Sequence, residues 1–336
     1  MKIFQNATFL TLLAMRNLRQ PSQKLEILSN FIIENYNKFR KKSNITNKPL
    51  IVGLNGIQGC GKTTIANELV KYLKATNDLS VVTCSIDDFL LTYKDQCKLA
   101  EKNFGNKLLE FRGQPGTHDI LLGKQILQEL CDVQKKYSDL HEKLEEEGSL
   151  KFSNLSVSIP SYDKSLNNGR GDRSPNWNVI LPPIHIILID GWCLGFNHLS
   201  SSKLKEAYDN ASSCSALKSH PISHLEIINE NLKQYEENWY PFLDIFICIE
   251  AEDINYVYQW RLEQEHNMKK TGKNGMSDEQ VKSFIDRYMP SYELYLETLY
   301  NENFFSGNFK GDKEIYGMHL KLLLNREREI IKVTLF

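Results

Sequence analysis

The chain has 336 residues, of which 41 are Lys or Arg and 42 are Asp or Glu, so its formal net charge at pH 7 is −1. This balance excludes nucleic-acid binding driven by bulk positive charge, because no excess of cations is available to neutralise a phosphate backbone. The apolar and charged fractions, 41% and 25%, are those of an ordinary globular protein, and no apolar run is long enough to span a membrane.

Seven cysteines are scattered through the chain without a C-x-x-C pair. An odd number at such spacings argues against a disulfide framework or a zinc site and favours a reducing compartment. We therefore expect a cytoplasmic protein, with the nucleus as a further location. We also expect a monomer or a homodimer that acts on small molecules rather than on nucleic acid or membranes.

The first 20 residues contain three cations and no acid. This composition is compatible with a mitochondrial transit peptide, and the alternative that we favour is an N-terminal helix packed on the domain. Residues 22–42 repeat apolar side chains at helical spacing after Pro21, which predicts an amphipathic helix. We assign residues 1–45 to an N-terminal helical extension and residues 46–336 to the main domain.

A phosphate-binding loop is predicted directly after an apolar strand at Leu50–Leu54. The segment 56–63 fits G-x-x-x-x-G-K-[ST], and apolar residues at helical spacing follow it. Glycines let backbone N–H groups surround a phosphate, and the helix dipole faces the same anion. Lys62 would reach the β- and γ-phosphates of ATP, and the Thr63 hydroxyl would hold Mg²⁺. The predicted ATP-binding residues are Gly56, Ile57, Gln58, Gly59, Cys60, Gly61, Lys62, Thr63 and Thr64.

Carboxylates follow the next two predicted strands. Asp87 and Asp88 come at the end of the strand 81–86, and Asp190 comes at the end of the strand 184–189. Ligands of open α/β sheets bind outside the carboxyl ends of strands, so these residues are expected near the nucleotide. Asp190 has the position of a Walker-B aspartate that binds Mg²⁺. The alternative for the pair of aspartates is helix capping.

Two Gly-rich segments lie between these strands. In residues 104–119, Thr117 is predicted to be the N-cap of a helix that ends near Cys131. The charged residues 132–150 are predicted to be a solvated helix or an insertion. The loop 162–173 contains cations that are able to bind an anion, although composition alone favours an ordinary polar surface loop.

The last third of the chain is predicted to be mostly helical, and Arg261 is its candidate functional residue. The predicted elements are helices in 199–240 with a Ser-rich break at 212–223, a strand at 244–250, a helix at 253–266, a Lys/Gly loop at 268–276, helices from Ser277 to Tyr288 and at 290–300, and a fifth strand at 330–335. Arg261 is either a lid cation that closes on a transferring phosphate or the partner of Glu265, four residues later. The sequence does not decide between these roles.

Strand–helix alternation around a phosphate-binding loop predicts a three-layer α/β fold with a parallel sheet. Several segments narrow the family. Residues 85–89 (SIDDF) resemble the S-x-D-x-F segment of uridine kinases, phosphoribulokinases and pantothenate kinases. The segments 112–119 (RGQPGTHD), 162–165 (YDKS), 171–173 (GDR), 190–196 (DGWCLGF), 257–266 and 276–292 resemble the plant and fungal D-glycerate 3-kinase branch.

The resemblance covers residues 20–300 and implies a P-loop kinase fold with sheet order 2-3-1-4-5, a helical lid at about residues 253–280, and insertions at about 132–150 and 199–223. It implies transfer of a phosphate from ATP–Mg²⁺ to a small hydroxylated acceptor such as D-glycerate. Asp87 matches the general base, Lys62 and Arg261 complete the catalytic set, and Thr63 with Asp190 would bind the metal. The implied acceptor-binding residues are Asp88, Arg112, His118, Tyr162, Lys164 and Arg173.

Two departures from the family pattern concern the site. Leu90 stands where relatives carry Tyr, and Cys60 replaces the usual Ser or Ala inside the phosphate loop. Two other functions also stay open at this level. One is a kinase for a nucleoside or a pantothenate-like alcohol, and the other is a non-catalytic ATP-binding switch protein.

Overall fold

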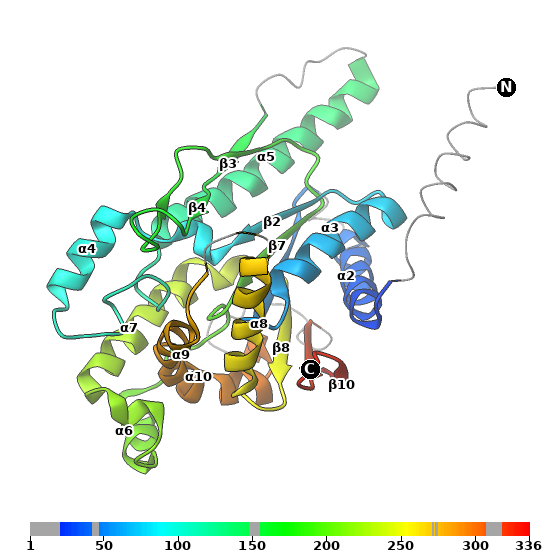
Figure 1. The fold of residues 1–336 in the computed structure, drawn as a ribbon. Helices are drawn as coiled ribbons and strands as arrows, with labels where there is room; N and C mark the ends of the chain where they lie inside the picture. The colour runs from blue at the N-terminus through cyan, green and yellow to red at the C-terminus, as the bar shows by residue number, and fades with distance from the viewer. Residues whose placement is uncertain (1–20, 42–46, 148–154, 271, 273–274, 307–317) are drawn as a thin grey trace.

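The computed structural model of the chain describes residues 21–41, 47–147, 155–270, 272, 275–306 and 318–336 (Figure 1). The N-terminal segment 1–20, which the sequence predicts to be a helix or a transit peptide, lies outside the described residues. The same holds for the end of the predicted insertion, 148–150, and for three residues of the predicted lid, 271 and 273–274.

A six-stranded sheet forms the centre of the molecule. Its strands have the order β10-β9-β8-β1-β7-β2, and all neighbouring pairs are parallel except the β9–β10 hairpin. The strands are β1 (Leu50–Gly56), β2 (Val81–Ser85), β7 (Ile186–Gly191), β8 (Ile245–Ala251), β9 (His319–Leu324) and β10 (Ile330–Leu335). Helices cover both faces of the parallel strands, which explains why β1 and β7 are buried along their whole length.

Numbered in chain order, the five parallel strands have the spatial order 2-3-1-4-5. The fifth of them is β9, which the sequence analysis did not predict. The predicted fifth strand is β10, which pairs antiparallel with β9 at the edge of the sheet. β10 was easier to recognise because it contains the β-branched residues typical of strands, whereas β9 is mostly leucine, which is equally common in helices.

The helices form two layers around the sheet, which confirms the predicted three-layer α/β fold. Figure 1 shows α2 (Gln23–Lys41) and α3 (Lys62–Asn77) on one side, and α5 (Ile120–Glu147), α7 (Ile222–Asn238) and α10 (Met289–Asn301) on the other. The remaining α-helices are α4 (Tyr93–Lys102), α6 (Ser201–Asn210), α8 (Tyr256–Lys270) and α9 (Asp278–Asp286). None of the described helices has both the length and the apolarity that crossing a bilayer requires.

Short elements complete the chain. The 3₁₀ helices are η1 (Ile86–Phe89), η2 (Ala216–Ser219), η3 (Tyr240–Phe242) and η4 (Phe304–Ser306). Two small antiparallel ladders pair β3 (Val157–Ile159) with β6 (Asn178–Ile180) and β4 (Tyr162–Asp163) with β5 (Asp172–Arg173).

The start of α5 differs from the prediction. Asp119, not Thr117, caps the helix, because its Oδ1 accepts a hydrogen bond from Leu122 N at 3.1 Å. The Thr117 hydroxyl instead closes the preceding loop, since it accepts from Gly113 N and donates to Gln114 O, both at 2.8 Å. The helix continues to Glu147, so most of the predicted charged insertion is an extension of α5.

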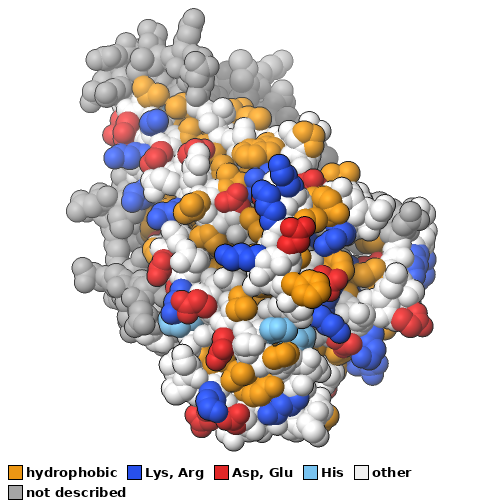
Figure 2. Space-filling model, turned by 90° about the vertical axis from the view of Figure 1, so that its left-hand side faces the viewer, with side chains coloured by type: hydrophobic (Ala, Val, Ile, Leu, Met, Phe, Trp, Pro, Cys, Tyr) orange, Lys and Arg blue, Asp and Glu red, His pale blue; other side chains and the backbone are white. Residues whose placement is uncertain are grey.

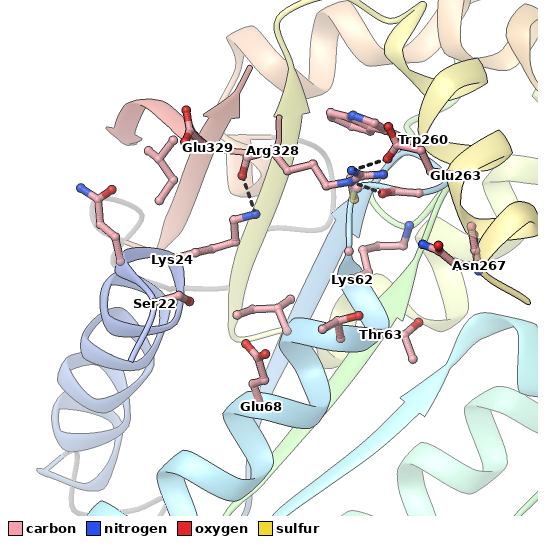
Figure 3. A pocket seen from close by; sticks show the side chains of 18 of the residues that line it. Ser22, Lys24, Lys62, Thr63, Glu68, Trp260, Glu263, Asn267, Arg328 and Glu329 are labelled. Atoms are coloured by element: carbon pink, nitrogen blue, oxygen red, sulfur yellow. Dashed lines mark hydrogen bonds and ion pairs between the residues drawn. The ribbon is translucent and has the colours of Figure 1, made fainter. Parts of the chain in front are cut away.

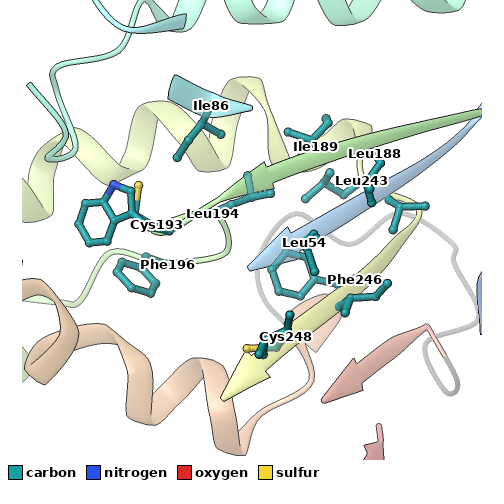
Figure 4. Close-up of a cluster of buried hydrophobic side chains, with 14 of the residues drawn as sticks. Leu54, Ile86, Leu188, Ile189, Cys193, Leu194, Phe196, Leu243, Phe246 and Cys248 are labelled. Carbon is teal, nitrogen blue, oxygen red and sulfur yellow. The ribbon is translucent and has the colours of Figure 1, made fainter. Parts of the chain in front are cut away.

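The core packs around the central strands along their whole length. Figure 4 shows Leu54 of β1, Leu188 of β7 and Phe246 of β8 among these buried side chains. Each fully buried side chain of this size stabilises the fold by roughly 1.5–3 kcal/mol. This packing fixes the strand ends, where the predicted functional residues lie.

The molecular surface mixes charges of both signs. On the face shown in Figure 2, Lys and Arg side chains are interspersed with Asp and Glu and with single apolar side chains. This face therefore matches the near-zero net charge of the chain.

Candidate active site

The phosphate-binding loop connects β1 to α3, as the motif predicts. Gly59 (φ 79°) and Gly61 (φ 97°) both have left-handed backbone conformations that side chains disfavour. Lys62 Nζ donates to the carbonyl oxygens of Gly56 at 2.5 Å and Ile57 at 3.1 Å. Cys60 is buried, and a Cβ at Gly56 would lie 2.6 Å from its sulfur. Cys60 thus fills a space inside the loop that requires glycine opposite it.

Gly59 also allows the loop to contact helix α8. A Cβ at this position would lie 2.6 Å from the Cβ and 2.9 Å from the carbonyl carbon of Trp260, whereas a Cβ at Gly61 would meet no atom within 4 Å. We therefore expect Gly59→Ala to lower the free energy of unfolding by about 2–4 kcal/mol, from backbone strain plus overpacking. Gly61→Ala, the matched control, should lose only about 1–2 kcal/mol from backbone strain. Urea unfolding curves of both variants measure this difference, and equal losses would contradict the proposed contact.

A cavity of about 1070 Å³ opens beside the loop. Figure 3 shows its walls: the phosphate-binding loop with Lys62 and Thr63, the start of α2 with Ser22 and Lys24, helix α8, and the turn of the β9–β10 hairpin. The cavity is large enough for a nucleotide. The cavity is also lined by residues near both ends of the described chain, Ser22–Lys24 and Arg328–Ile330. The loop motif gives no indication of these lining residues.

Arg328 in the hairpin turn ties these walls together. Its guanidinium donates to Gly59 O and pairs with Glu263 of α8, both at 2.8 Å, and lies 5.0 Å from the centre of the Trp260 ring. Lys24 of α2 donates to Arg328 O at 3.0 Å, and burial lowers the pKa of this lysine. These contacts join residues up to 304 positions apart. No local pattern in the sequence identifies them.

The three predicted carboxylates lie together at the carboxyl ends of β2 and β7. Asp190 is beside Ser85 in the β2–β7 register, and the two aspartates of η1 follow Ser85. Ser85 is the N-cap of η1, and Asp88 completes the capping box, because its Oδ2 accepts from Ser85 N at 2.9 Å. The capping alternative therefore holds for Asp88. Burial raises the pKa of Asp190, and it raises the pKa of Asp88 to about 6.

Asp87 is the carboxylate that pairs with a cation. Its Oδ2 lies 2.5 Å from Lys164 Nζ. Burial, the largest single influence, raises the pKa of Asp87, but the Lys164 ammonium together with His118 and Lys62 outweighs burial and lowers this pKa to about 2. His118 contributes to the same electrostatic environment. Its Nδ1 lies 2.6 Å from the Tyr235 hydroxyl, and burial lowers its pKa to about 4. Asp87 is therefore ionised and His118 neutral at pH 7.

The other predicted acceptor-binding residues hold the surrounding loops. Arg112 donates to Gly169 O at 2.7 Å and lies over the ring of Tyr162, 5.7 Å from its centre. Arg173 pairs with Asp119 at 3.2 Å and donates to Leu90 O at 3.1 Å. Among the predicted anion-binding cations, Lys164 is the one that contacts a predicted catalytic residue.

Arg261 adopts the second of the two predicted arrangements. It pairs with Glu265 of the same helix and lies over Phe284 of α9, 5.0 Å from the ring centre. Glu265 is 2% exposed, and its Oε2 accepts from Met276 N at 2.9 Å. The pair therefore connects α8 to the segment that leads into α9.

Asn55 of β1 is a positioning residue that the sequence analysis missed. Its buried amide donates to the carbonyl oxygens of Trp192 at 3.1 Å and Leu194 at 2.7 Å. These bonds fix the segment that follows Asp190. The signal was present, because a polar residue inside an apolar strand needs buried hydrogen-bond partners.

The donor set suits a hard cation. Thr63 is exposed at the start of α3, and Asp190 is a buried carboxylate at the end of β7. Oxygen ligands of this kind suit Mg²⁺, which commonly takes one or two protein ligands together with phosphate oxygens. Among the described residues, no group of three or more His, Cys, Asp or Glu side chains is arranged to hold a metal by itself.

Comparison with known proteins identifies several relatives. The chain is 40% identical over 256 residues to the chloroplastic D-glycerate 3-kinase of Arabidopsis thaliana. This match covers 76% of this chain and 49% of that protein. The chain thus spans about half the length of this relative. It is 36% identical over 275 residues to the "uncharacterized kinase mug58" of Schizosaccharomyces pombe, covering 81% of this chain and 90% of the relative. No protein-family model matches the chain.

Among solved structures, a D-glycerate 3-kinase from Cryptococcus neoformans superposes with a TM-score of 0.80. The two chains are 35% identical, and the match covers 94% of this chain and 100% of the other. The similarity therefore covers nearly the whole of both chains.

Proposed function

The chain belongs to the family of P-loop kinases that includes D-glycerate 3-kinase, and on this premise we propose that it is an ATP- and Mg²⁺-dependent kinase that phosphorylates a hydroxyl group of a small anionic acceptor. D-glycerate is the acceptor that we favour, because two relatives carry that substrate in their names. The observation that carries the proposal is the position of the paired carboxylate Asp87 at the strand ends beside the phosphate-binding loop.

The donor nucleotide would lie between the loop and the adjoining cavity. The N–H groups of the loop from Gly56 to Thr64 and the Lys62 ammonium would hold the phosphates of ATP, and the cavity would take the nucleoside. Thr63 and Asp190 are the residues that would hold Mg²⁺, which when bound neutralises charge on the phosphate oxygens.

The protein groups have separate roles in transfer. The ionised Asp87 carboxylate would accept the hydrogen bond of the acceptor hydroxyl and take its proton. Lys62 would neutralise charge on the transferring phosphoryl group. Arg261 would add a second cation when the lid closes. Its guanidinium would then break its ion pair with Glu265 or contact Glu265 and the phosphate at the same time. Positioning and charge stabilisation supply most of the rate enhancement in such transfers.

The side chains around Asp87 favour an acid over a nucleoside as acceptor. Lys164 contacts Asp87, and Arg112 donates to the main chain of the same loop at Gly169 and, at 3.5 Å, at Lys164. Cations so close to the base suit an anionic substrate. Asp88, His118, Tyr162 and Arg173 complete the proposed acceptor surroundings, with Asp88 and Arg173 acting through the backbone that they hold.

A coupled ADP-release assay tests the proposal. The acceptors compared are D-glycerate, L-glycerate, uridine, pantothenate, ribulose 5-phosphate and water alone. We expect release that depends on D-glycerate. Release stimulated only by uridine or pantothenate would assign the chain to the alternative kinase class, and slow release independent of every acceptor would indicate an ATP-binding switch.

The nucleoside part of the donor site gives a separate prediction. Lys24→Met and Arg328→Met should each raise the KM for ATP about tenfold with little change in kcat, because each removes a charge-assisted hydrogen bond at the cavity wall. Arg326→Met is the control, since Arg326 is exposed, bonds to Gln259 and does not line the cavity. Initial rates at varied ATP concentration measure the effect. Unchanged KM values would show that the nucleoside does not bind in this cavity.

We also propose that the protein works in the cytoplasm, with the nucleus as a further location, as a monomer or a homodimer. All seven cysteines are free thiols, which supports a reducing compartment.

A further inference from the structure

Arg287, at the C-terminal end of α9, stands out among the arginines around the Asp87 site. Arg112, Arg173 and Arg261 each bond to a carbonyl or a carboxylate oxygen. The Arg287 guanidinium is partly buried, and among the described residues its side-chain contacts are with aromatic rings. A guanidinium has five N–H donors, and those of Arg287 are open to solvent, because none of them is among the buried polar atoms that lack a partner in the described residues. The arrangement thus points to an anion that is bound from outside.

Aromatic rings hold the Arg287 guanidinium in place. Its central carbon lies 4.5 Å from the centre of the Phe111 ring and 5.5 Å from that of Phe284. Arg261 lies over the same Phe284 ring at 5.0 Å, so one ring of α9 contacts both cations. Stacking on rings keeps a guanidinium planar and oriented while its N–H edges stay available for a bidentate contact.

The backbone of Arg287 is fixed against the loop that carries Arg112. Gln114 Nε2 donates to Arg287 O at 2.5 Å, and Gln114 Oε1 accepts from the Ser291 hydroxyl at 2.8 Å. Gln114 is 2% exposed, so this connection is part of the core. The loop and the α9–α10 junction therefore position Arg287 as one rigid unit.

Tyr288 connects this unit to the segment that follows Asp190. Its ring packs edge-on against Trp192, which follows Asp190 by two residues, with 4.7 Å between ring centres. A Cβ at Gly113 would lie 2.2 Å from its hydroxyl oxygen. Burial raises the pKa of Tyr288 to about 12, and the charges of Arg287, Asp87, Arg112 and Arg261 all act on this group.

We propose that Arg287 binds the carboxylate of an α-hydroxy-acid acceptor and so selects acids over neutral alcohols at the Asp87 site. A carboxylate matches the planar fork of a guanidinium, and the ring contacts leave that fork free of protein acceptors among the described residues. The proposal rests on the proposed kinase function and adds a residue that the family motifs did not assign. Arg287 would bind the acid group, while Asp87 contacts the hydroxyl.

The test compares Arg287→Gln and Arg287→Lys with Arg170→Gln. Arg170 lies over the same Phe111 ring at 5.1 Å, but it donates to Glu110 O at 3.0 Å, so it is the matched control. Rates are measured with D-glycerate and with the neutral analogue glycerol, and ATP binding is measured by calorimetry. Arg287→Gln should lower kcat/KM for D-glycerate roughly 100-fold, as expected for loss of one partner of a charged hydrogen-bonded pair. Glycerol turnover and ATP affinity should not change.

Arg287→Lys should recover part of the loss, because an ammonium keeps the charge but not the bidentate geometry. Arg170→Gln should behave as the unmodified enzyme. A D-glycerate rate within threefold of the unmodified enzyme in Arg287→Gln would overturn the proposal, and so would equal losses with D-glycerate and glycerol, which indicate a structural role. If the unmodified enzyme turns over no hydroxy acid, the proposed function fails first and this inference fails with it.

Discussion

Replacing Lys62 with alanine is expected to lower kcat by about 10³-fold or more, the loss typical of removing a charge that stabilises the transition state. The Lys62 ammonium contacts two carbonyl oxygens of the phosphate-binding loop. Its charge contributes to the lowered pKa of Asp87 and partly offsets the burial that raises the pKa of Asp190. It therefore lies between the phosphate-binding loop and the strand-end carboxylates, where the transferring phosphoryl group would pass. The measurement is ADP release at saturating ATP and acceptor.

Lys71→Ala is the matched control for Lys62→Ala. Lys71 is exposed on the same helix, α3, and does not line the cavity. Its loss should leave turnover unchanged. If Lys62→Ala also retained full turnover, the phosphate-binding loop would not be the donor site, and the assignment of every residue around it would fail.

Asp87→Asn is expected to keep ATP affinity and to lose about 10²–10⁴-fold in kcat, the usual contribution of a general base. An amide cannot take the hydroxyl proton, and it pairs only weakly with Lys164. Calorimetry measures ATP binding, and the coupled assay measures turnover. Asp163→Asn is the control, since Asp163 is exposed at the end of β4 and, among the described residues, its carboxylate bonds to Ser165. Full activity in Asp87→Asn would show that the base lies elsewhere or that none is needed.

The pKa of Asp87 makes this role testable by pH. A pKa of about 2 keeps the carboxylate ionised through the working range, so Asp87 should cause no fall in kcat/KM between pH 8 and 5. Lys164→Met removes the cation and leaves the burial, so the pKa of Asp87 should rise and an acidic decline should enter this range. Because the folded pKa lies below the unfolded value, the Asp87–Lys164 pair stabilises the fold above about pH 4 and loses this effect as the pH falls toward 2.

The sequence predicted well the elements that are determined by residues within one short segment. The loop 56–63 carries its own glycines, lysine and threonine in one segment, between an apolar strand and a helix. Asp87 and Asp190 were expected near it because the carboxyl ends of parallel strands meet at one edge of a sheet. The predicted start of a helix at Ser277 has the same local character and is confirmed, because Ser277 and Gln280 form the capping box of α9.

The features of the site that could not be predicted from the sequence depend on contacts between segments far apart in the chain. The Asp87–Lys164 pair spans 77 residues, and Arg328 reaches Gly59 across 269. Composition alone favoured an ordinary surface loop around Lys164, and nothing near Arg328 indicated a nucleotide. Arg287 was missed because its role follows from the rings of Phe111 and Phe284, which no motif links to it.

We propose that the loop and the strand-end carboxylates together transfer the γ-phosphate of ATP to a small acid. The most direct measurement follows γ-³²P-labelled ATP with D-glycerate and magnesium, and separates phosphoglycerate from inorganic phosphate. Labelled 3-phosphoglycerate, formed by the unmodified enzyme and not by Asp87→Asn, is the predicted result. Label that appears only in inorganic phosphate, or only in a phosphorylated nucleoside when uridine is added, would contradict the account.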